Sequence, residues 1–199
     1  MDDHASPGPR RFPGTGSAAL IGSATVLLLT LAGPARAGDH PPVAARSGLE
    51  LAWAAAQSWA PDAYLSYVEN DEDLDGSGAS PRWGYLFHSP SLEKSRVYSI
   101  RDGKILVAEN LDMKFEAPPL AGDWIDSGRA LAVADAQVGR AYRAKHQGRL
   151  STMLLMRGAF QDGDPDVTTW TVIYTSPGAP ALFVMVDASG AKVRRTWRG

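Results

Sequence analysis

The chain has 199 residues, of which 22 are acidic and 20 are basic, and 44% are apolar. This near balance of charge gives no excess that would attract nucleic acid, and the apolar content is too high for an intrinsically disordered chain. The chain has no cysteine, so we expect neither disulfides nor a lipid-modified cysteine, and the fold must depend on its hydrophobic core. Composition therefore predicts a globular protein with no nucleic-acid partner.

Residues 1–37 have the layout of a secretory signal peptide. Arg10 and Arg11 form a basic start, residues 18–32 are almost all small or apolar, and Ala35-Arg36-Ala37 has the small residues that a signal peptidase reads. The apolar run is about 15 residues, shorter than the roughly 20 that a spanning helix needs. We expect Sec-type export to the periplasm or out of the cell. A membrane contact follows only if this segment is retained.

A helix followed by four strands is predicted for residues 38–118. Ser47 to Glu50 matches a capping box, Leu49, Ala52 and Ala56 recur at helical spacing, and Pro61 ends the run. We expect strands near 64–68, 83–88, 95–100 and 104–108. Asp102-Gly103 is a strong signal for a tight hairpin between the last two.

An acidic loop joins the first two of these strands. Asp71, Asp73 and Asp75 occupy positions one, three and five of a calcium-loop pattern, and a glycine follows at position six. The twelfth position should be a bidentate glutamate, but Arg82 stands there. A second acidic run, 162–166, falls in the corresponding loop of the later half of the chain. Either a calcium site or a solvated hairpin tip is consistent with this pattern.

The same order of elements is predicted for residues 119–199, after a Pro-rich linker at 116–122. Asp126 or Ser127 is placed to cap a helix whose apolar stripe includes Leu131, Ala134 and Val138. Strands are expected near 150–156, 169–175, 181–186 and 192–197. The linker is short and rich in proline, so we expect it to be stiff.

The two halves also match each other in sequence. Residues 83–90 (WGYLFHSP) align without a gap with residues 170–177 (WTVIYTSP), 87 residues further on. The runs 153–156 and 182–186 are apolar at every position, which indicates strands covered on both faces. We therefore predict an α+β fold of two tandem units that pack together or share a sheet, each with one helix on a three- or four-stranded antiparallel sheet.

The second half resembles a PepSY-type domain. The resemblance depends on an alanine-rich helix at 130–136, on Trp170-x-Val172-x-Tyr174, and on residues 184–193 (VMVDASGAKV), which are similar to the closing hairpin of that family. It implies a small exported module without catalytic residues, in a family linked to restraining peptidases or to binding at the cell surface. A cystatin-like fold has nearly the same order of elements and is the structural alternative.

The tryptophans and the basic C-terminal strand are candidates for surface contacts. Trp124 and Trp197 lie near segment ends and are expected to be exposed, whereas the helix and strand positions predict a core role for Trp53, Trp59, Trp83 and Trp170. The basic residues of the last strand predict either a charged edge that discourages aggregation or docking to an acidic surface. They are Lys192, Arg194, Arg195 and Arg198.

No motif in the sequence indicates a particular reaction. There is no Gly-x-Ser-x-Gly elbow, no phosphate-binding loop and no histidine pair at zinc spacing. We therefore expect a non-enzymatic binding or inhibitory module without a cofactor, whose partner is a protein such as a peptidase or a cell-envelope component. An exported hydrolase with a site between the two units and a calcium-dependent structural protein are the alternatives.

Overall fold

A computed structural model of the chain describes residues 40–112, 117–158 and 166–199. Helix α1 (Leu49–Trp59) is followed by strands β1 (Tyr64–Asn70), β2 (Arg82–Ser89), β3 (Lys94–Arg101) and β4 (Lys104–Asn110). The later half contains α2 (Ser127–Ala134), a π-helical turn η1 (Asp135–Gly139), α3 (Arg140–His146), β5 (Arg149–Arg157), β6 (Thr168–Ser176), β7 (Ala179–Asp187) and β8 (Val193–Arg198). Each predicted strand is present within a few residues of its expected bounds. The predicted signal peptide, 1–37, lies outside the described residues.

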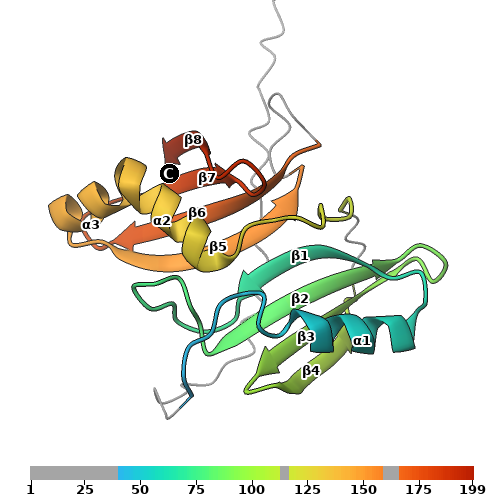
Figure 1. The fold of residues 1–199 in the computed structure, drawn as a ribbon. Coiled ribbons are helices and arrows are strands. Elements are labelled where there is room, and N and C mark those ends of the chain that lie inside the picture. The colour runs from blue at the N-terminus through green and yellow to red at the C-terminus, as the bar shows by residue number, and fades with distance from the viewer. Residues whose placement is uncertain (1–39, 113–116, 159–165) are drawn as a thin grey trace, which may run out of the picture. The chain divides into compact units, whose positions relative to one another are not determined.

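All eight strands belong to one antiparallel sheet, in the order β4-β3-β2-β1-β5-β6-β7-β8 (Figure 1). Strands that follow each other in the chain pair as hairpins, and the two halves join where β1 pairs with β5, with Val68 opposite Leu155. The α+β class is confirmed. Of the two arrangements expected for the halves, the structure has the shared sheet: β1 pairs with β5 across the expected boundary at 118/119, so the two four-stranded halves form one eight-stranded sheet. Joining the halves in this way removes two unpaired strand edges.

All helices in the described part of the chain cover one face of this sheet. The Trp53 ring of α1 meets the Phe87 ring of β2 at a centroid distance of 5.5 Å. In the later half, Tyr174 Oη of β6 donates a hydrogen bond of 2.7 Å to Asp135 Oδ1 of η1. Residues opposite each other in the ladders share a face, and the register from β2 through β1 and β5 to β6 places Phe87 and Tyr174 on the same one.

We call the side that carries the helices the helix face and the opposite side the open face. Val68 and Leu155 point to the helix face and are fully buried. Their neighbours Tyr67 and Glu69 therefore point to the open face, since side chains alternate along a strand. No described helix covers the open face.

Two matching tryptophans anchor the helix face. Trp83 of β2 and Trp170 of β6 are almost completely buried, and their rings meet edge to face at 6.2 Å. Trp83 Nε1 donates a hydrogen bond to the Val43 carbonyl (2.8 Å), and Trp170 Nε1 donates one to the Ile125 carbonyl (2.7 Å). Each indole thus fixes the segment that leads into the helix of its own half.

The structure corrects two of the tryptophan predictions. Trp124 is only 4% exposed, because its ring packs at 5.9 Å from Trp170 and the Arg46 guanidinium lies 4.0 Å above it. Trp53 is 43% exposed although it lies on the predicted apolar stripe of the first helix. A stripe of small residues, Ala52 and Ala56, makes the closest approach to the sheet and leaves Trp53 at the margin.

The two helix starts also differ from each other. The capping box predicted at Ser47 is wrong, since Gly48 is the N-cap of α1 and no side chain caps it. A Cβ at Gly48 would lie 2.8 Å from Tyr85 Oη, so the close approach of β2 requires glycine here. Asp126 caps α2 as predicted, and its Oδ1 accepts hydrogen bonds from the amides of Ser127 (2.8 Å) and Arg46 (3.1 Å).

Candidate functional site

The centre of the open face carries a cluster of ionisable side chains on β1, β2 and β3. Glu69 of β1 lies opposite Gly84 of β2 on one side and opposite Leu154 of β5 on the other, so it occupies the join between the two halves. Together the members form what we call the open-face cluster: Tyr67, Glu69, Asp71, Glu72, Arg82, Ser99 and Arg101.

Glu69 is a buried carboxylate whose hydrogen-bond donor is a tyrosine. Tyr67 Oη donates a hydrogen bond of 2.5 Å to Glu69 Oε2, and Glu69 is only 9% exposed. Burial raises the pKa of Glu69 to about 7; the charge of Asp71 adds to this effect and the Tyr67 hydrogen bond opposes it. Burial also raises the pKa of Tyr67, so the phenol stays protonated. Glu69 therefore exchanges a proton near neutral pH.

Asp71 lies over the backbone of β2 in a space that only glycine leaves free. A Cβ at Gly84 would lie 2.7 Å from Asp71 Oδ1. Ser99 Oγ donates a short hydrogen bond to Asp71 Oδ2, and Arg82 Nε lies 3.6 Å from the same oxygen. Burial raises the pKa of Asp71, against the lowering effects of Ser99 and Arg82. The carboxylate is thus held in place by residues of two strands, β2 and β3.

Two arginines partly neutralise the cluster. Arg101 Nη2 pairs closely with Glu72 Oε1, and Arg82 Nε lies 3.7 Å from that oxygen. The Nε atoms of both arginines are buried and have no hydrogen-bond partner in the described part of the chain. Three carboxylates therefore face two guanidinium groups, and Glu69 is the carboxylate without an arginine. Such a site can accept a cation or a hydrogen-bond donor from a bound molecule.

The three residues of the predicted calcium loop go to different places. Asp71 belongs to the open-face cluster, Asp73 is exposed, and Asp75 folds back onto its own loop, where its Oδ1 accepts hydrogen bonds from Ser77 N (2.8 Å) and Ala79 N (3.0 Å). Among the residues that the structure describes, no three acidic or histidine side chains are arranged to hold a metal ion. Of the second acidic run, 162–165 lie outside the described residues.

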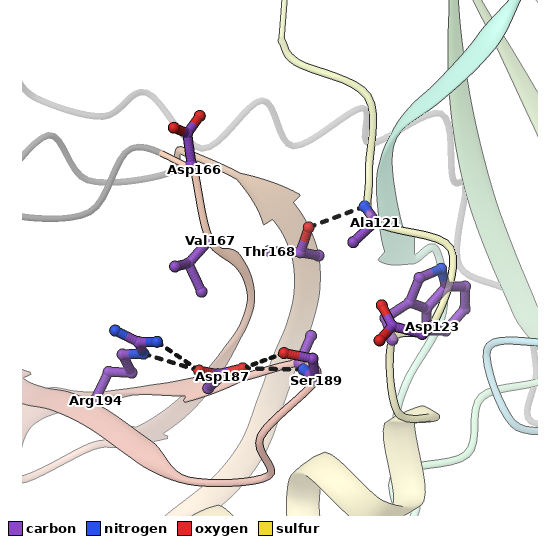
Figure 2. A pocket seen from close by; sticks show the side chains of 10 residues that line it. Ala121, Asp123, Asp166, Val167, Thr168, Asp187, Ser189 and Arg194 are labelled. Atoms are coloured by element: carbon purple, nitrogen blue, oxygen red, sulfur yellow. Dashed lines mark hydrogen bonds and ion pairs between the residues drawn. The ribbon is translucent and has the colours of Figure 1, made fainter.

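A small hollow lies at the hairpin between β7 and β8 (Figure 2). Asp187 Oδ1 accepts hydrogen bonds from Ser189 N (3.0 Å) and Gly190 N (2.8 Å), and Oδ2 accepts from Arg194 Nε (3.0 Å) and Nη2 (2.6 Å). Burial acts to raise the pKa of Asp187, but these hydrogen bonds outweigh it and lower the pKa to about 2. The hollow has a volume of about 140 Å³, below the roughly 300 Å³ of small ligand sites. Asp187 therefore holds the turn.

Most of the open-face cluster was not predicted from sequence. Only Asp71 had been singled out, as a calcium ligand. The available signal was the alternation of Tyr67, Glu69 and Asp71, which puts three ionisable groups on one face of a strand. Ser99, which binds Asp71, and Arg101, which binds Glu72, belong to β3, a strand that does not follow β1 directly in the chain, so these contacts depend on the sheet register.

Comparisons with known proteins give a fold but no family. No family model matches the chain, and no curated protein sequence matches it. The fold is similar to the crystal structure of a "putative lipoprotein" from Clostridium difficile 630, with a TM-score of 0.52 and 15% sequence identity over 82% of this chain and 97% of that one. At this identity the likeness is one of fold alone. Among the described residues, none of the helices has the length and apolar character needed to cross a bilayer.

Proposed function

We propose that this protein is an exported, non-enzymatic binding or inhibitory module that docks a protein partner on the open face of its sheet. One observation carries the proposal: the helices cover one face, while the other combines a charged cluster with half-buried aromatic and aliphatic side chains. These side chains are Tyr67, Met156, Phe183 and Trp197. Tyrosine, tryptophan, methionine and arginine are the residues enriched at protein interfaces.

The open face also carries buried polar groups. The hydroxyls of Thr169 and Thr171 on β6 are buried and have no hydrogen-bond partner among the described residues. Their register partners are Met156 and Leu154, so they lie on the same face as Glu69, with β5 between them. Because these hydroxyls are closed to solvent, a docked protein would contact the half-buried side chains around them and place a basic or donor group near Glu69. The cavities of about 140 and 350 Å³ are not lined by residues of the open-face cluster, which favours a broad surface over a small-molecule pocket.

Export and a tandem origin belong to the same proposal. The layout of residues 1–37 supports Sec-type export to the periplasm or medium, and the fold shared with a lipoprotein agrees with export. We infer that the halves arose by duplication of one PepSY-like unit; the pairing of Val68 with Leu155, the residue 87 positions later, fits a duplication. On that resemblance, the partner is a peptidase or a cell-envelope component.

An exported hydrolase is the second candidate, and one observation favours it. Glu69 has a pKa of about 7, lies beside Asp71, and occupies the strand that joins the halves. A carboxyl group that titrates near neutral pH suits general acid catalysis. Turnover on peptide, ester or glycoside panels that disappears in Glu69→Gln would favour this candidate over the binding module.

Site-directed crosslinking in cells that export the full chain tests the docking surface. A photoreactive phenylalanine analogue replaces Phe183 on the open face or, as the matched control, Leu51 on α1, which is 36% exposed. We expect one discrete adduct from position 183, weakened by Tyr67→Ala, and none from position 51. Absence of an adduct at 183, or the same adducts at both positions, would contradict docking on the open face.

A further inference from the structure

A second concave site lies on the helix face, between the last helix and the edge strand. This groove has a volume of about 350 Å³ and is lined by η1 and α3 on one side and by β7 and β8 on the other. Val138, Ala141 and Leu182 line it with aliphatic surface, and the Tyr142 ring adds an aromatic wall. Its size matches the lower range of small-ligand sites.

The charge of the groove has one sign. Lys145, His146 and Arg198 line it, and no aspartate or glutamate is among its lining residues. Arg198 Nη1 lies 3.4 Å from His146 Nε2, and the Arg198 guanidinium lies 5.0 Å from the centre of the Tyr142 ring. Neither Lys145 nor Arg198 forms an ion pair with a carboxylate of the described residues.

Burial and the two neighbouring cations act together on the histidine. Its partial burial and the charges of Arg198 and Lys145 lower the pKa of His146. A bound anion would offset the repulsion between these groups, and hydrogen bonds between charged partners are about twice as strong as neutral ones.

The backbone beside the groove is irregular in a way that ligand sites often show. Gln137 and Val138, which line the groove, belong to the π-helical turn η1. Such turns are rare and occur frequently at functional sites. Gly139 ends the turn at a position where a Cβ would lie 2.2 Å from Tyr174 Oη, so the close contact with β6 depends on this glycine.

We propose that this groove binds an organic carboxylate with a short apolar body. The carboxylate would lie between Arg198 and Lys145, and the body would lie on Val138, Ala141 and Leu182. A free organic acid and the C-terminus of a peptide share this chemistry. The groove shares Trp197 with the open face but contains no residue of the open-face cluster, and the binding of a carboxylate is tested without reference to the docking proposal.

Titration of the purified protein by heteronuclear NMR tests the site with defined probes. Hexanoate and its uncharged amide share the apolar body, and a leucine-terminated tetrapeptide with a free or an amidated C-terminus separates the two sources of carboxylate. We expect saturable shifts at Lys145 and Tyr142 with hexanoate, at a Kd in roughly the millimolar range, and at least about tenfold weaker binding of the amide. Tighter binding of the free peptide than of hexanoate identifies a peptide C-terminus, and the reverse order identifies a free acid.

Matched variants make the result decisive. Lys145→Gln combined with Arg198→Gln should weaken hexanoate binding about tenfold or more, whereas Arg140→Gln, an exposed cation on the same helix outside the groove, should leave it unchanged. Ala141→Leu fills the groove without changing its charge and should also weaken binding. A site of the expected affinity would be largely filled at about 10 mM hexanoate. The proposal would be overturned if the groove residues showed no saturable shift up to that concentration, or if the acid and the amide bound equally well.

Discussion

In the first half of the sheet, the 11-residue helix α1 lies over β2 and β3; in the second half, α2, η1 and α3 occupy the corresponding place. Both halves keep a buried tryptophan whose indole N–H donates to the segment before the helix. They differ in how the helix begins and in whether it is regular. The strand register and the tryptophan anchor are therefore common to both halves, while the helices differ between them.

The halves also use buried carboxylates in opposite ways. In the first half, Glu69 lies inside the open face with a raised pKa of about 7. In the second half, Asp187 lies at a hairpin turn with a lowered pKa of about 2, because amides and Arg194 donate to it. The turn carboxylate stabilises the fold when ionised, whereas the open-face carboxylate opposes folding when ionised. We associate the first arrangement with binding and the second with structure.

The largest effect is expected from the tryptophan anchors. Trp83→Ala and Trp170→Ala should each lower the free energy of unfolding by about 3–5 kcal/mol, since each removes a buried indole and its hydrogen bond. Urea denaturation of both single variants and the double variant measures this. Because the rings touch, we expect the double variant to lose less than the sum, by about 0.5–1.5 kcal/mol.

Conservative variants separate packing from hydrogen bonding at these anchors. Trp83→Phe and Trp170→Phe keep an aromatic ring and should cost about 1–3 kcal/mol each, through the unsatisfied carbonyl and the lost volume. If one substitution left the free energy of unfolding nearly unchanged while the other caused the full loss, the two tryptophans would not have the same role. The comparison between the halves would then fail.

A somewhat smaller loss of stability is expected at the glycine in each half that lies in close contact with a tyrosine hydroxyl. Gly139→Ala places a Cβ 2.2 Å from Tyr174 Oη, and Gly48→Ala places one 2.8 Å from Tyr85 Oη. We expect losses of about 2–3 and about 1 kcal/mol, respectively, in the free energy of unfolding. Gly178→Ala, where no atom lies within 4 Å, is the control and should change stability by less than about 0.5 kcal/mol. Equal losses at all three positions would indicate a general effect of glycine instead.

The two carboxylates predict opposite pH dependences in separate ranges. Asp187 has an unfolded pKa of roughly 3.9 and a folded pKa of about 2, so its contribution, about 2.5 kcal/mol, is present above pH ~4 and is lost as the pH falls toward 2. Glu69 has an unfolded pKa of roughly 4.3 and a folded pKa of about 7, so the fold loses about 3 kcal/mol as the pH rises from ~4 to ~7.

Difference curves isolate these contributions from other titrating groups. Denaturation from pH 2 to 8 should show the fall in stability above pH ~4 in the wild-type chain and its absence in Glu69→Gln. Asp187→Asn should instead remove part of the rise between pH ~2 and ~4. A Glu69→Gln curve parallel to that of the wild type would mean that Glu69 has the same pKa in the folded and the unfolded chain, and the contrast between the two carboxylates would disappear.

The sequence predicted the strands well because hydrophobic runs and turn residues are local signals. Asp102-Gly103 joins β3 and β4 as expected, with Asp102 at φ 49° and Gly103 at φ 67°. Asp126 likewise caps the helix it was expected to cap. The capping box at Ser47 failed because the contact between Gly48 and Tyr85 is tertiary, and no window of sequence contains it.

The candidate sites were less predictable for the same reason. The open-face cluster requires Asp71 to lie over Gly84 and beside Ser99, which depends on the pairing of three strands. The groove on the helix face requires a π-helical turn that the apolar stripe at Leu131, Ala134 and Val138 does not reveal. Two features were predicted from sequence: the apolar stripe, which contributes Val138 to the groove, and the basic character of β8, which contributes Arg198.

The smallest effect is expected in the acidic loop of the first half. Asp75→Ala removes hydrogen bonds from the Ser77 amide and hydroxyl and from the Ala79 amide, but the loop is exposed, so we expect a loss of only about 0.5–1 kcal/mol. Because Asp71 already binds Ser99 and Asp75 binds its own loop, 1 mM Ca²⁺ should raise the melting temperature by less than about 1 °C in both wild type and variant. A rise of several degrees in the wild type that Asp75→Ala abolishes would show that the loop rearranges to gather its carboxylates around the ion, and the calcium hypothesis would then replace the solvated loop.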